Sequence, residues 1–450
     1  MSLVVESARP GGAKAPPYIG EAVAPPYRAA TRIAFRFCFL YFGLYVLTTQ
    51  MLGGIIVIPG DWNMPELETL PPLKNLITWT AAHVFRVPTP LVITGSGSGD
   101  KTFDWIAAFC LLVMCTLGTA IWSAIDRKRD TYATAHKWFR VFLRFALGST
   151  MLSYGMVKAI PLQMPAPPLT RLLEPFGNFS PMGVLWYSIG ASHAYERFAG
   201  GMELLAAVLL FIPRTTTLGA LVLLADSVQI FTLNMTYDVP VKLFSFHLIL
   251  MALVLLAPES RRLLNVLVLN RPAPPSSQPP LVHGMHARKL LLGAQLAFAG
   301  YLIIIFVLSS RQSWVTYGGG APRPALYGIW DVEKMSINGI ERSPLVTDYD
   351  RWRRVVVHAP TFISFQRMDE SFATYPAKTD VDHHTIVLTR QSDPSWKTQF
   401  TFQRPYPDHL ILDGTMDGRR VRMDLQRFDH TKMPLLTRGF NWIQEYPFNR

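Results

Sequence analysis

The fold of this chain is decided by residues 153–247, where long apolar runs are interrupted by three polar segments: Ser153-Tyr154-Gly155-Met156-Val157-Lys158, Tyr195-Glu196-Arg197-Phe198-Ala199-Gly200-Gly201-Met202-Glu203 and Asn234-Met235-Thr236-Tyr237-Asp238-Val239-Pro240-Val241-Lys242. The apolar runs predict membrane-spanning helices. An ionisable side chain at the centre of a bilayer costs about 2.5–3.5 kcal/mol, so such residues are rare in spans unless they pair, face a cavity or take part in chemistry. The stretch therefore predicts a helical membrane region with a polar site inside it.

The composition of the whole chain also indicates a membrane protein. Of its 450 residues, 50% are hydrophobic and only 16% are charged. Several apolar runs reach the roughly 17–25 residues that a helix needs to cross a bilayer. The formal net charge is +12, and the basic residues gather at the ends of apolar runs, as the positive-inside rule describes. We therefore expect the lipid bilayer as a partner and no nucleic acid.

Seven membrane spans are expected from the apolar runs and from the segments rich in proline, glycine and charged residues that separate them. Basic residues before the first run and within 126–130 place the N-terminus in the cytoplasm and the C-terminal domain outside, which in a bacterial inner membrane is the periplasmic side. Arg36 and Arg144 lie inside apolar runs near the interior surface and are expected to snorkel toward water. The expected spans are 33–58, 104–125, 141–160, 186–212 with an interruption near 190–193, 215–234, 241–257 and 290–309.

The same separating segments divide the chain into parts. We expect a disordered cytoplasmic tail, two N-terminal spans with a long periplasmic loop between them, a four-helix core, a cytoplasmic linker with the seventh span, and a periplasmic β domain. Their bounds are 1–30, 31–140 with its loop at 59–103, 141–258, 259–310 and 321–450.

The long loop contains the run Gly95-Ser96-Gly97-Ser98-Gly99-Asp100-Lys101-Thr102, which is superficially similar to a phosphate-binding loop. The pattern fails, because Asp100 stands where that motif needs glycine and no buried strand precedes the run. We expect instead a tight Gly/Ser turn, in which Asp100 caps the helix that follows.

Residues after about 321 have the composition of a soluble β domain. Short runs rich in β-branched or aromatic residues predict antiparallel strands at 354–357, 362–365, 385–388 and 399–402. Asp413-Gly414 and Asp417-Gly418 predict hairpin turns. The motif Leu326-x-Gly328-x-Trp330 resembles the opening of lipocalin-type barrels. The fold class expected is thus a polytopic α-helical membrane protein with a C-terminal all-β barrel or sandwich.

Helical spacing places the polar residues of the core on shared faces. Tyr154 and Lys158 are separated by one turn, and Glu196 and Glu203 share a face with Gly200, which lets another helix or a ligand approach closely. Because successive spans alternate in direction, these residues meet in the exterior half of the membrane. The candidate catalytic residues are Lys158, Glu196, Glu203, Asp238 and Lys242, and the candidate substrate-binding residues are Tyr154, Gln163, Arg197, Asp226, Asn234, Tyr237 and His247.

Two interpretations of this cluster remain open. In one, the cluster lines a pocket in which a buried lysine acts as a base. In the other, the cations pair with the carboxylates and hold the bundle together. Cys38, Cys110 and Cys115 lie inside spans without a paired C-x-x-C motif, so no metal site is expected. No flavin or haem motif is recognisable, and the cofactor hypothesis is a bound quinone or lipid.

The segments Ser153-Tyr154-Gly155-x-x-Lys158, Tyr195-Glu196-Arg197-Phe198-x-Gly200-x-x-Glu203 and Leu233-Asn234-x-x-Tyr237-Asp238-Val239-Pro240-Val241-Lys242-Leu243 resemble the DoxX-like family of bacterial membrane proteins over residues 141–258. That resemblance implies a four-helix membrane unit related to a subunit associated with a thiosulfate:quinone oxidoreductase. A more distant similarity is to the membrane core of vitamin K-dependent carboxylase-like (HTTM) proteins, which implies that Lys158 is a reactive base.

Three functional hypotheses follow from these observations. The leading one is a DoxX-like inner-membrane protein that serves as a quinone- or lipid-linked oxidoreductase component, with a lipophilic small molecule and a redox or membrane protein as partners. The second is a non-enzymatic, membrane-anchored lipocalin-like protein for binding or scaffolding. The third is a carboxylase-like enzyme with a lysine base, or a transporter, for which an interrupted span is typical.

Overall fold

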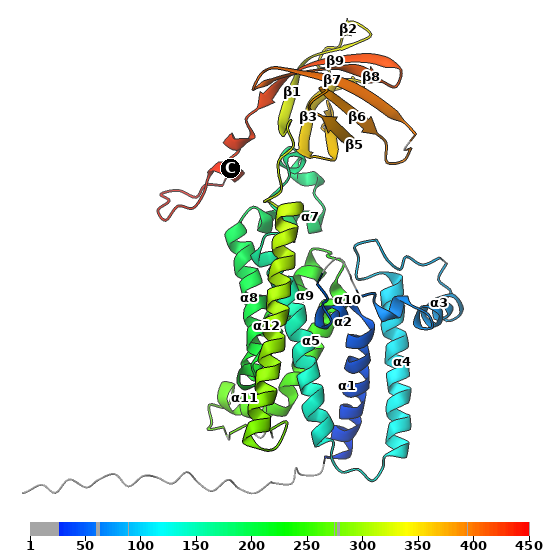
Figure 1. Ribbon diagram of the computed structural model, residues 1–450, viewed down its shortest axis with the longest axis vertical. Helices are drawn as coiled ribbons and strands as arrows, with labels where there is room; N and C mark the ends of the chain where they lie inside the picture. The colour runs from blue at the N-terminus through cyan, green and yellow to red at the C-terminus, as the bar shows by residue number, and fades with distance from the viewer. Residues whose placement is uncertain are drawn as a thin grey trace, which may run out of the picture.

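The computed structural model describes residues 27–59, 64–88, 90–273, 275–276, 280–393 and 395–449. These residues form a bundle of long helices with a β-barrel stacked on one end (Figure 1). The polytopic helical region and the C-terminal all-β barrel that the sequence predicts are therefore confirmed. Most of the predicted disordered tail, up to residue 26, lies outside the described residues.

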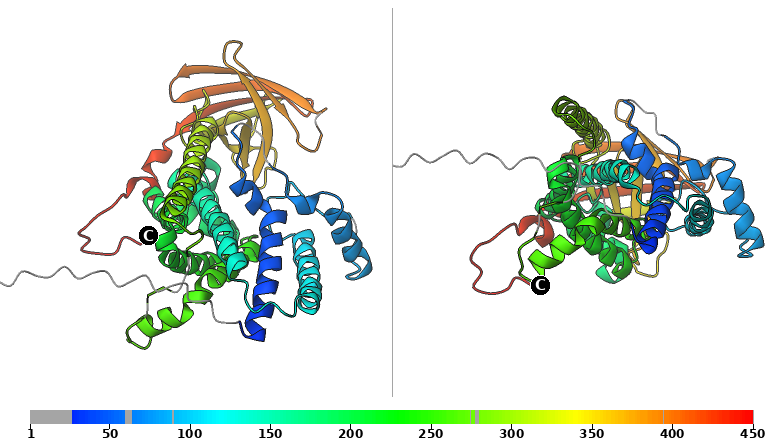
Figure 2. Two further views of the ribbon diagram at one scale, coloured as in Figure 1. Left: turned by 60° about the horizontal axis from the view of Figure 1, so that its bottom comes forward. Right: turned by 90° about the horizontal axis from the view of Figure 1, so that it is seen from below.

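Five stretches are long and apolar enough to cross a membrane: Ala29–Thr48, Thr102–Ile125, Pro213–Thr236, Lys242–Leu267 and Met285–Thr316. They coincide with the first, second, fifth, sixth and seventh expected spans. The helices at the third and fourth expected spans lie in the same bundle but carry most of the ionisable residues of the core (Figures 1 and 2). The described helices are α1 (Ala29–Thr48), α2 (Gln50–Ile55), α3 (Leu73–His83), α4 (Thr102–Ile125), α5 (Ala133–Ala159), α6 (Leu169–Leu172), α7 (Pro181–Gly190), α8 (His193–Phe211), α9 (Thr216–Thr236), α10 (Lys242–Leu256), α11 (Ser260–Leu267), α12 (Met285–Thr316) and α13 (Pro434–Thr437).

Two expected spans are broken into separate helices. The first ends at Thr48 rather than at residue 58, because Thr49 takes an extended conformation and α2 follows. The expected interruption near 190–193 is the break between α7 and α8. Ser180 and Ser192 cap these two helices, each accepting a hydrogen bond from a backbone N–H three residues later. Serine side chains thus mark both helix starts.

Helix α5 is the centre of the bundle and contacts α1, α2, α8, α10 and α12. Its closest approach is to α8, where two glycines meet. A Cβ atom on Gly200 would lie 2.6 Å from the backbone oxygen of Gly155, and one on Gly155 would lie 2.9 Å from the backbone oxygen of Gly200. The predicted role of Gly200 in close helix approach is therefore confirmed. This contact brings the charged faces of α5 and α8 together.

Arginines at the end of the bundle away from the barrel do not snorkel. Arg36 and Arg144 are buried, which corrects the expectation that they reach water. Arg144 donates to the backbone oxygens of Leu210 and Phe211 at the end of α8, at 2.9 and 3.0 Å. Arg36 donates to the Tyr132 hydroxyl and to the backbone oxygen of Asp126 after α4. Unpaired helix-end carbonyls attract these cations more strongly than a long reach to solvent.

The strands form one antiparallel sheet that closes on itself. Each strand from β3 onward pairs with the next, and β1 pairs with both β3 and β9, so that β2 remains a short hairpin extension of β1. The strands are β1 (Gly328–Ile337), β2 (Ile340–Glu341), β3 (Trp352–Ala359), β4 (Phe362–Arg367), β5 (Phe372–Asp380), β6 (Thr385–Thr389), β7 (Lys397–Tyr406), β8 (His409–Met416) and β9 (Arg419–Phe428). All the predicted strand runs lie inside these elements.

One of the two predicted hairpin turns is wrong. Asp417-Gly418 forms the turn between β8 and β9, with both residues at positive φ. Asp413-Gly414 instead lies inside β8, where Gly414 pairs with Phe400 and Val421. A Cβ atom on Gly414 would lie 2.3 Å from the backbone oxygen of Gln399. Glycine is needed at this position because two backbones approach closely within a strand, and not because the chain turns.

The barrel interior is filled by side chains. Trp330, Phe365 and Phe400 are buried in its centre, together with aliphatic residues from β6, β8 and β9. A small cavity of about 170 Å³ remains at one mouth, between Met335, Trp352 and Met416. A lipid-sized ligand inside the barrel, as the lipocalin-like binding hypothesis would need, is therefore not favoured by this packing.

The barrel rests on a loop of the helical region. Leu169, at the start of α6, is buried against Ile329 of β1 and Val356 of β3, two residues that point away from the barrel core. Met433, beyond the last strand, packs against the same cluster. This apolar contact fixes the barrel over the end of the bundle where α5 ends and α8 begins (Figure 1).

Candidate functional site

The predicted catalytic residues Lys158 and Glu203 form a buried ion pair. The Nζ of Lys158 lies 2.6 and 2.8 Å from the two carboxylate oxygens of Glu203, and both side chains are nearly inaccessible to solvent. Asp226 of α9 interacts electrostatically with this pair, and its Oδ2 has no hydrogen-bond partner among the described residues. The close α5–α8 crossing at the two glycines makes the pair possible. Within the core, this pair matches the interpretation in which the charges hold helices together.

Glu196 occupies a second buried position, at the first turn of α8. Its side chain is 0% exposed, and its Oε1 accepts a hydrogen bond from the backbone N–H of Met164 at 3.0 Å. Its Oε2 lies 3.7 Å from the Nδ1 of His193. Gln163 lies next to Met164, and its backbone oxygen accepts from the Trp186 indole at 3.0 Å. Glu196 therefore fastens the loop after α5 to the break between α7 and α8.

The predicted residues at the junction of α9 and α10 mainly stabilise that turn. Asn234 donates to the Ser245 hydroxyl at 3.0 Å, and Tyr237 packs with neighbouring apolar residues. Lys242 pairs with Asp238 at 2.9 Å, but the Asp238 side chain is 83% exposed. Arg197 is exposed on α8 and joins none of these contacts. These residues do not converge on one pocket.

Asp100 corrects the expectation for the Gly/Ser loop. Its carboxylate accepts from the backbone N–H groups of Lys242 and Leu243, at 2.8 and 2.9 Å, and so caps α10 rather than the helix that directly follows. The latter helix, α4, is capped by Asp104, which accepts from the backbone N–H of Lys101 at 2.9 Å. The backbone N–H of Gly99 also donates to the oxygen of Pro240. These hydrogen bonds hold the loop against the helical core, where it forms one wall of a cavity.

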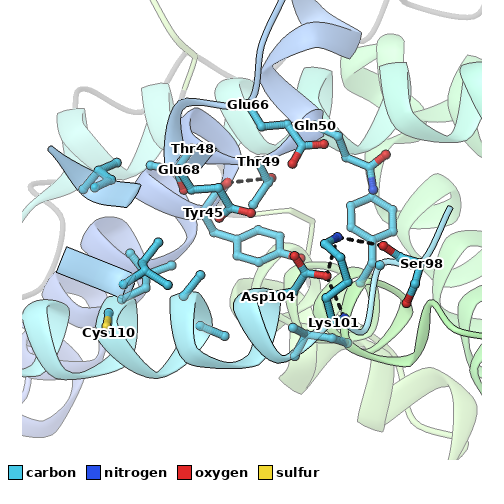
Figure 3. A pocket seen from close by; sticks show the side chains of 18 of the residues that line it. Tyr45, Thr48, Thr49, Gln50, Glu66, Glu68, Ser98, Lys101, Asp104 and Cys110 are labelled. Carbon is cyan, nitrogen blue, oxygen red and sulfur yellow. Dashed lines mark hydrogen bonds and ion pairs between the residues drawn. The ribbon is translucent and has the colours of Figure 1, made fainter. Parts of the chain in front are cut away.

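This wall encloses a cavity of about 270 Å³ that the sequence did not predict. Figure 3 shows its polar side, where Glu66, Glu68 and Asp104 surround a space bordered by Tyr45. Lys101 closes one edge, 2.8 Å from Asp104 and 2.7 Å from the backbone oxygen of Ser98. The opposite side is apolar and is formed by α3 and α4, with Leu76, Ile77, Ala107, Ala108, Leu111 and Met114. The cavity therefore has one polar and one apolar side.

A second and larger cavity, of about 930 Å³, adjoins the first. It lies between the end of α1 with α2, the outer half of α5, and α12. Its apolar lining includes Ile56, Val57 and Met64 from the loop and Ile305, Phe306 and Leu308 from α12. The two cavities share Gln50, Glu66, Tyr154 and Phe244. These four residues form the partition between the first cavity, here called the polar chamber after its carboxylates and Lys101, and the larger chamber, whose lining also includes polar side chains such as Thr150, Ser309 and Gln312.

Tyr154 connects the predicted cluster with the two cavities. Its hydroxyl donates to the Oε1 of Gln50 at 3.3 Å, and the Nζ of Lys158 lies 5.6 Å from the centre of its ring. His247 lies directly behind the cavity wall, with its ring stacked on Tyr45 at 4.0 Å and its Nε2 2.9 Å from the Tyr41 hydroxyl. Of the predicted residues, Tyr154 lines both cavities, whereas Lys158, Glu196, Glu203, Asp238 and Lys242 line neither.

Among the acidic residues of the polar chamber, Glu68 has the most strongly shifted pKa. It lies in the loop outside the spans, and burial raises its pKa to about 8, with the negative charges of Glu66 and Asp104 adding to the shift. Burial also raises the pKa of Glu66. The Lys101 ammonium acts in the opposite direction on both. The chamber can therefore hold a proton on Glu68 near neutral pH and can donate as well as accept hydrogen bonds.

The residues that the sequence analysis missed come from the loop 59–103 and its flanks. Glu66, Glu68, Lys101 and Asp104 stand in a segment that looks like an ordinary polar loop. The sequence offered one signal. Three carboxylates lie within one loop and the helix turn that follows it, and they come into a common polar space when that loop folds back on apolar helices. Among the described residues, no group of three His, Cys, Asp or Glu side chains comes together with the geometry of a metal site.

Comparison with known proteins gives one informative relative. The chain is 33% identical over 137 aligned residues to a protein from Bacillus subtilis (strain 168) named "Uncharacterized protein YwoB", and the match covers 79% of that protein and 28% of this chain. The chain belongs to the YwoB family. No family model matches the chain, and no solved structure matches it.

Membership of the YwoB family concerns a limited part of this chain, since most of the 450 residues lie outside the match. The relative's name describes no activity. The DoxX-like resemblance and the similarity to carboxylase-like proteins gain no support from these comparisons. The function must therefore be inferred from the cavities and the charges around them.

Proposed function

We propose that this protein binds an amphipathic lipophilic molecule, of the quinone or lipid class, at the barrel-side end of its helical bundle. The observation that carries the proposal is the junction of the two cavities at Gln50, Glu66, Tyr154 and Phe244. A polar head group fits the chamber with Glu66, Glu68, Asp104 and Lys101, whose carboxylates and ammonium group can hydrogen-bond to it. An apolar chain fits the larger chamber along its apolar stretch of Ile56, Val57, Met64, Ile305, Phe306 and Leu308, while Thr150, Ser309 and Gln312 give the same chamber polar groups.

The location proposed is a bacterial inner membrane, with the barrel on the periplasmic side. Clusters of basic residues at the end of the bundle opposite the barrel support this orientation, because positive charge is retained on the cytoplasmic side. The lipid bilayer is the partner of the five apolar helices. The basic residues lie between α4 and α5, in α11 and in the first turn of α12: Arg127, Lys128, Arg129, Arg261, Arg262, Arg288 and Lys289.

A role as an oxidoreductase component is the finer form of this proposal. It rests on the resemblance to DoxX-like proteins, and it would require a bound quinone or a redox partner to supply electrons. Lys158 serves this form of the proposal only indirectly. Both carboxylate oxygens of Glu203 hold its ammonium group, so a reaction that uses it as a base would first have to separate the pair.

The binding proposal is tested with a matched pair of substitutions on α4. Ala108 lines the polar chamber, and Ala120 is exposed on the same helix. We expect Ala108→Trp to fill the chamber and Ala120→Trp to leave it open. The full chain is purified in polymer-bounded native lipid discs, and small lipophilic molecules are extracted and compared with the bulk lipid by mass spectrometry.

An amphipathic molecule enriched with the wild type and with Ala120→Trp, and lost with Ala108→Trp, would support the proposal. Equal enrichment in all three proteins would refute this chamber as the binding site. No enrichment in the wild type would refute the binding of a resident lipophilic molecule.

A further inference from the structure

The segment after the barrel, residues 434–449, is a surface that the proposed function does not use. It begins at α13, directly after Met433, which packs at the contact between the barrel and α6. The segment does not continue around the barrel. It turns back from the barrel to the level of the barrel-side end of the helical bundle (Figure 1, red). Figure 2 shows the same segment projecting beside the bundle.

The outer part of this segment exposes large apolar side chains to an unusual extent. Phe440, Trp442, Ile443 and Tyr446 are 76%, 90%, 82% and 85% exposed. Within seven residues the chain thus places three aromatic rings and an isoleucine away from the protein. Contiguous exposed apolar groups of this size generally mark a surface that contacts a membrane or another macromolecule.

Contacts within the segment hold it in a closed loop. The guanidinium of Arg438 donates to the Oε1 of Gln444 at 3.1 Å and lies 4.7 Å from the centre of the Phe448 ring. Asn441 donates to the backbone oxygen of Arg438 at 3.2 Å. Phe440 and Trp442 meet edge to face, with ring centres 4.9 Å apart. These contacts stabilise the loop while Phe440, Trp442, Ile443 and Tyr446 stay exposed.

The helical bundle exposes aromatic residues at the same end. Phe176, in the turn before α7, is 76% exposed, and Tyr195 and Phe198, on the first turns of α8, are 46% and 64% exposed. Trp and Tyr concentrate where the hydrocarbon of a bilayer meets its head groups, because they combine an apolar body with a polar group, and an exposed Phe beside them adds apolar surface. These residues therefore mark the level of the bilayer interface, and the loop 438–448 lies at the same end of the bundle (Figure 1).

We propose that the loop 438–448 inserts Phe440, Trp442, Ile443 and Tyr446 into the head-group region of the phospholipid bilayer on the barrel side. The loop attaches the barrel to the membrane directly, in addition to its chain connection through α12 and its contact with α6. Its occupant is the lipid interface rather than a protein, because the loop lies at the level of the bundle's own interfacial aromatics. The barrel is thereby held against the membrane surface.

The test measures the surroundings of single labels in the full chain. Cys38, Cys110 and Cys115 are replaced by alanine, and one new cysteine is introduced by Trp442→Cys or, separately, by Tyr446→Cys. The control is Val346→Cys, since Val346 is 66% exposed and follows β2 at the far end of the barrel. Each protein carries an environment-sensitive fluorophore and is placed in discs of phosphatidylcholine and phosphatidylglycerol, with or without lipids that bear a nitroxide at the head group.

We expect blue-shifted emission for labels at 442 and 446, quenched several-fold more strongly by the nitroxide lipid than the label at 346. Water-like emission at 442 and 446, equal to that at 346, would overturn the proposal. So would emission that is shifted but not quenched by the lipid nitroxide, because the loop would then be packed on protein. Two label positions keep the result interpretable if one substitution by itself weakens insertion.

Discussion

The Lys158–Glu203 pair shows what a single residue contributes in the middle of this bundle. The two side chains come from α5 and α8 and meet where neither reaches water. Removing both charges together also removes the cost of desolvating them, whereas removing one leaves the other buried without a counter-ion. The same physics explains why a cluster of costly residues in a sequence need not be catalytic. Here it joins the two helices that carry most of the core's charges.

We predict that Glu203→Ala destabilises the protein by about 3–5 kcal/mol, because the Lys158 ammonium is left buried without a counter-ion. The double change Lys158→Met with Glu203→Leu should recover most of this loss. Asp238→Ala, which breaks the exposed pair with Lys242, should cost at most about 1 kcal/mol. Thermal unfolding of the purified full chain in detergent measures all three. A Glu203→Ala protein as stable as the Asp238→Ala protein would contradict the prediction.

Glu68 predicts a dependence of stability on pH. Its pKa rises from an ordinary 4.5 to about 8 in the folded protein, so the folded state retains a proton that the unfolded state has lost between these values. The resulting stabilisation is fully present below pH 4.5 and is lost as the pH rises through about 8. The midpoint of thermal unfolding should therefore fall across this window, and less steeply in Glu68→Gln. Parallel curves for the two proteins would refute this role of Glu68.

At the scale of helices, the crossing of α5 and α8 depends on two glycines. A Cβ atom on Gly200 would meet Gly155 and Ala159 backbone atoms at 2.6 Å. Neither backbone can move without disturbing the ion pair one turn away. Small residues at such crossings allow close backbone contact, which replaces part of the hydrophobic driving force that is absent between helices in lipid.

We therefore predict that Gly200→Ala destabilises the folded protein by about 1–3 kcal/mol through overpacking. Gly201→Ala is the matched control, since no atom lies within 4 Å of a Cβ at that position and alanine favours the helix. The control should be neutral or slightly stabilising. Thermal unfolding compares the two variants directly, and similar midpoints for both would contradict the tight crossing.

For the whole molecule, the position of the barrel depends on a small apolar contact. Leu169 is buried against Ile329 and Val356, two barrel residues whose side chains point away from the barrel core. This contact and the tail beyond β9 both lie at the base of the barrel. The barrel is therefore a domain resting on a loop between α5 and α7, and its orientation over the cavities follows from that loop.

We predict that Leu169→Asp releases the barrel without unfolding it. The buried carboxylate would lose hydration with no partner, so the contact should open. Hydrogen exchange should then increase at Ile329 and Val356 on β1 and β3, while amides of β7 and β8 remain protected. Leu435→Asp, at a position 58% exposed, is the control and should leave all strands unchanged. Unchanged exchange at β1 and β3 in Leu169→Asp would show that α6 does not position the barrel.

Several features could be predicted from the sequence because neighbouring residues determine them. Runs of apolar residues set which segments enter the membrane, and alternating β-branched residues set which segments become strands. Ser180 and Ser192 start helices within their own sequence neighbourhood. The faces that carry Tyr154 with Lys158, and Glu196 with Gly200 and Glu203, follow from helical spacing alone.

Other features were decided by residues far apart in the chain. Asp100 could cap either of two helices, and it caps α10 because the loop folds across the bundle. Asp413-Gly414 has the composition of a turn, yet pairing with β7 and β9 keeps it inside a strand. Several carboxylates were expected at the same depth in the membrane as Lys158. Lys158 pairs with Glu203 because the two glycines bring α5 and α8 close together.

By itself, the sequence determined a helical membrane region followed by a β-barrel, and it placed the polar residues near one end of the bundle. Only the tertiary structure decided that most of those charges close on one another, and that the open space lies beside them under the loop 59–103. The physical reason is that hydropathy and period are properties of short windows of chain. A cavity is the space left between surfaces from distant segments, and its walls exist only after those segments have packed.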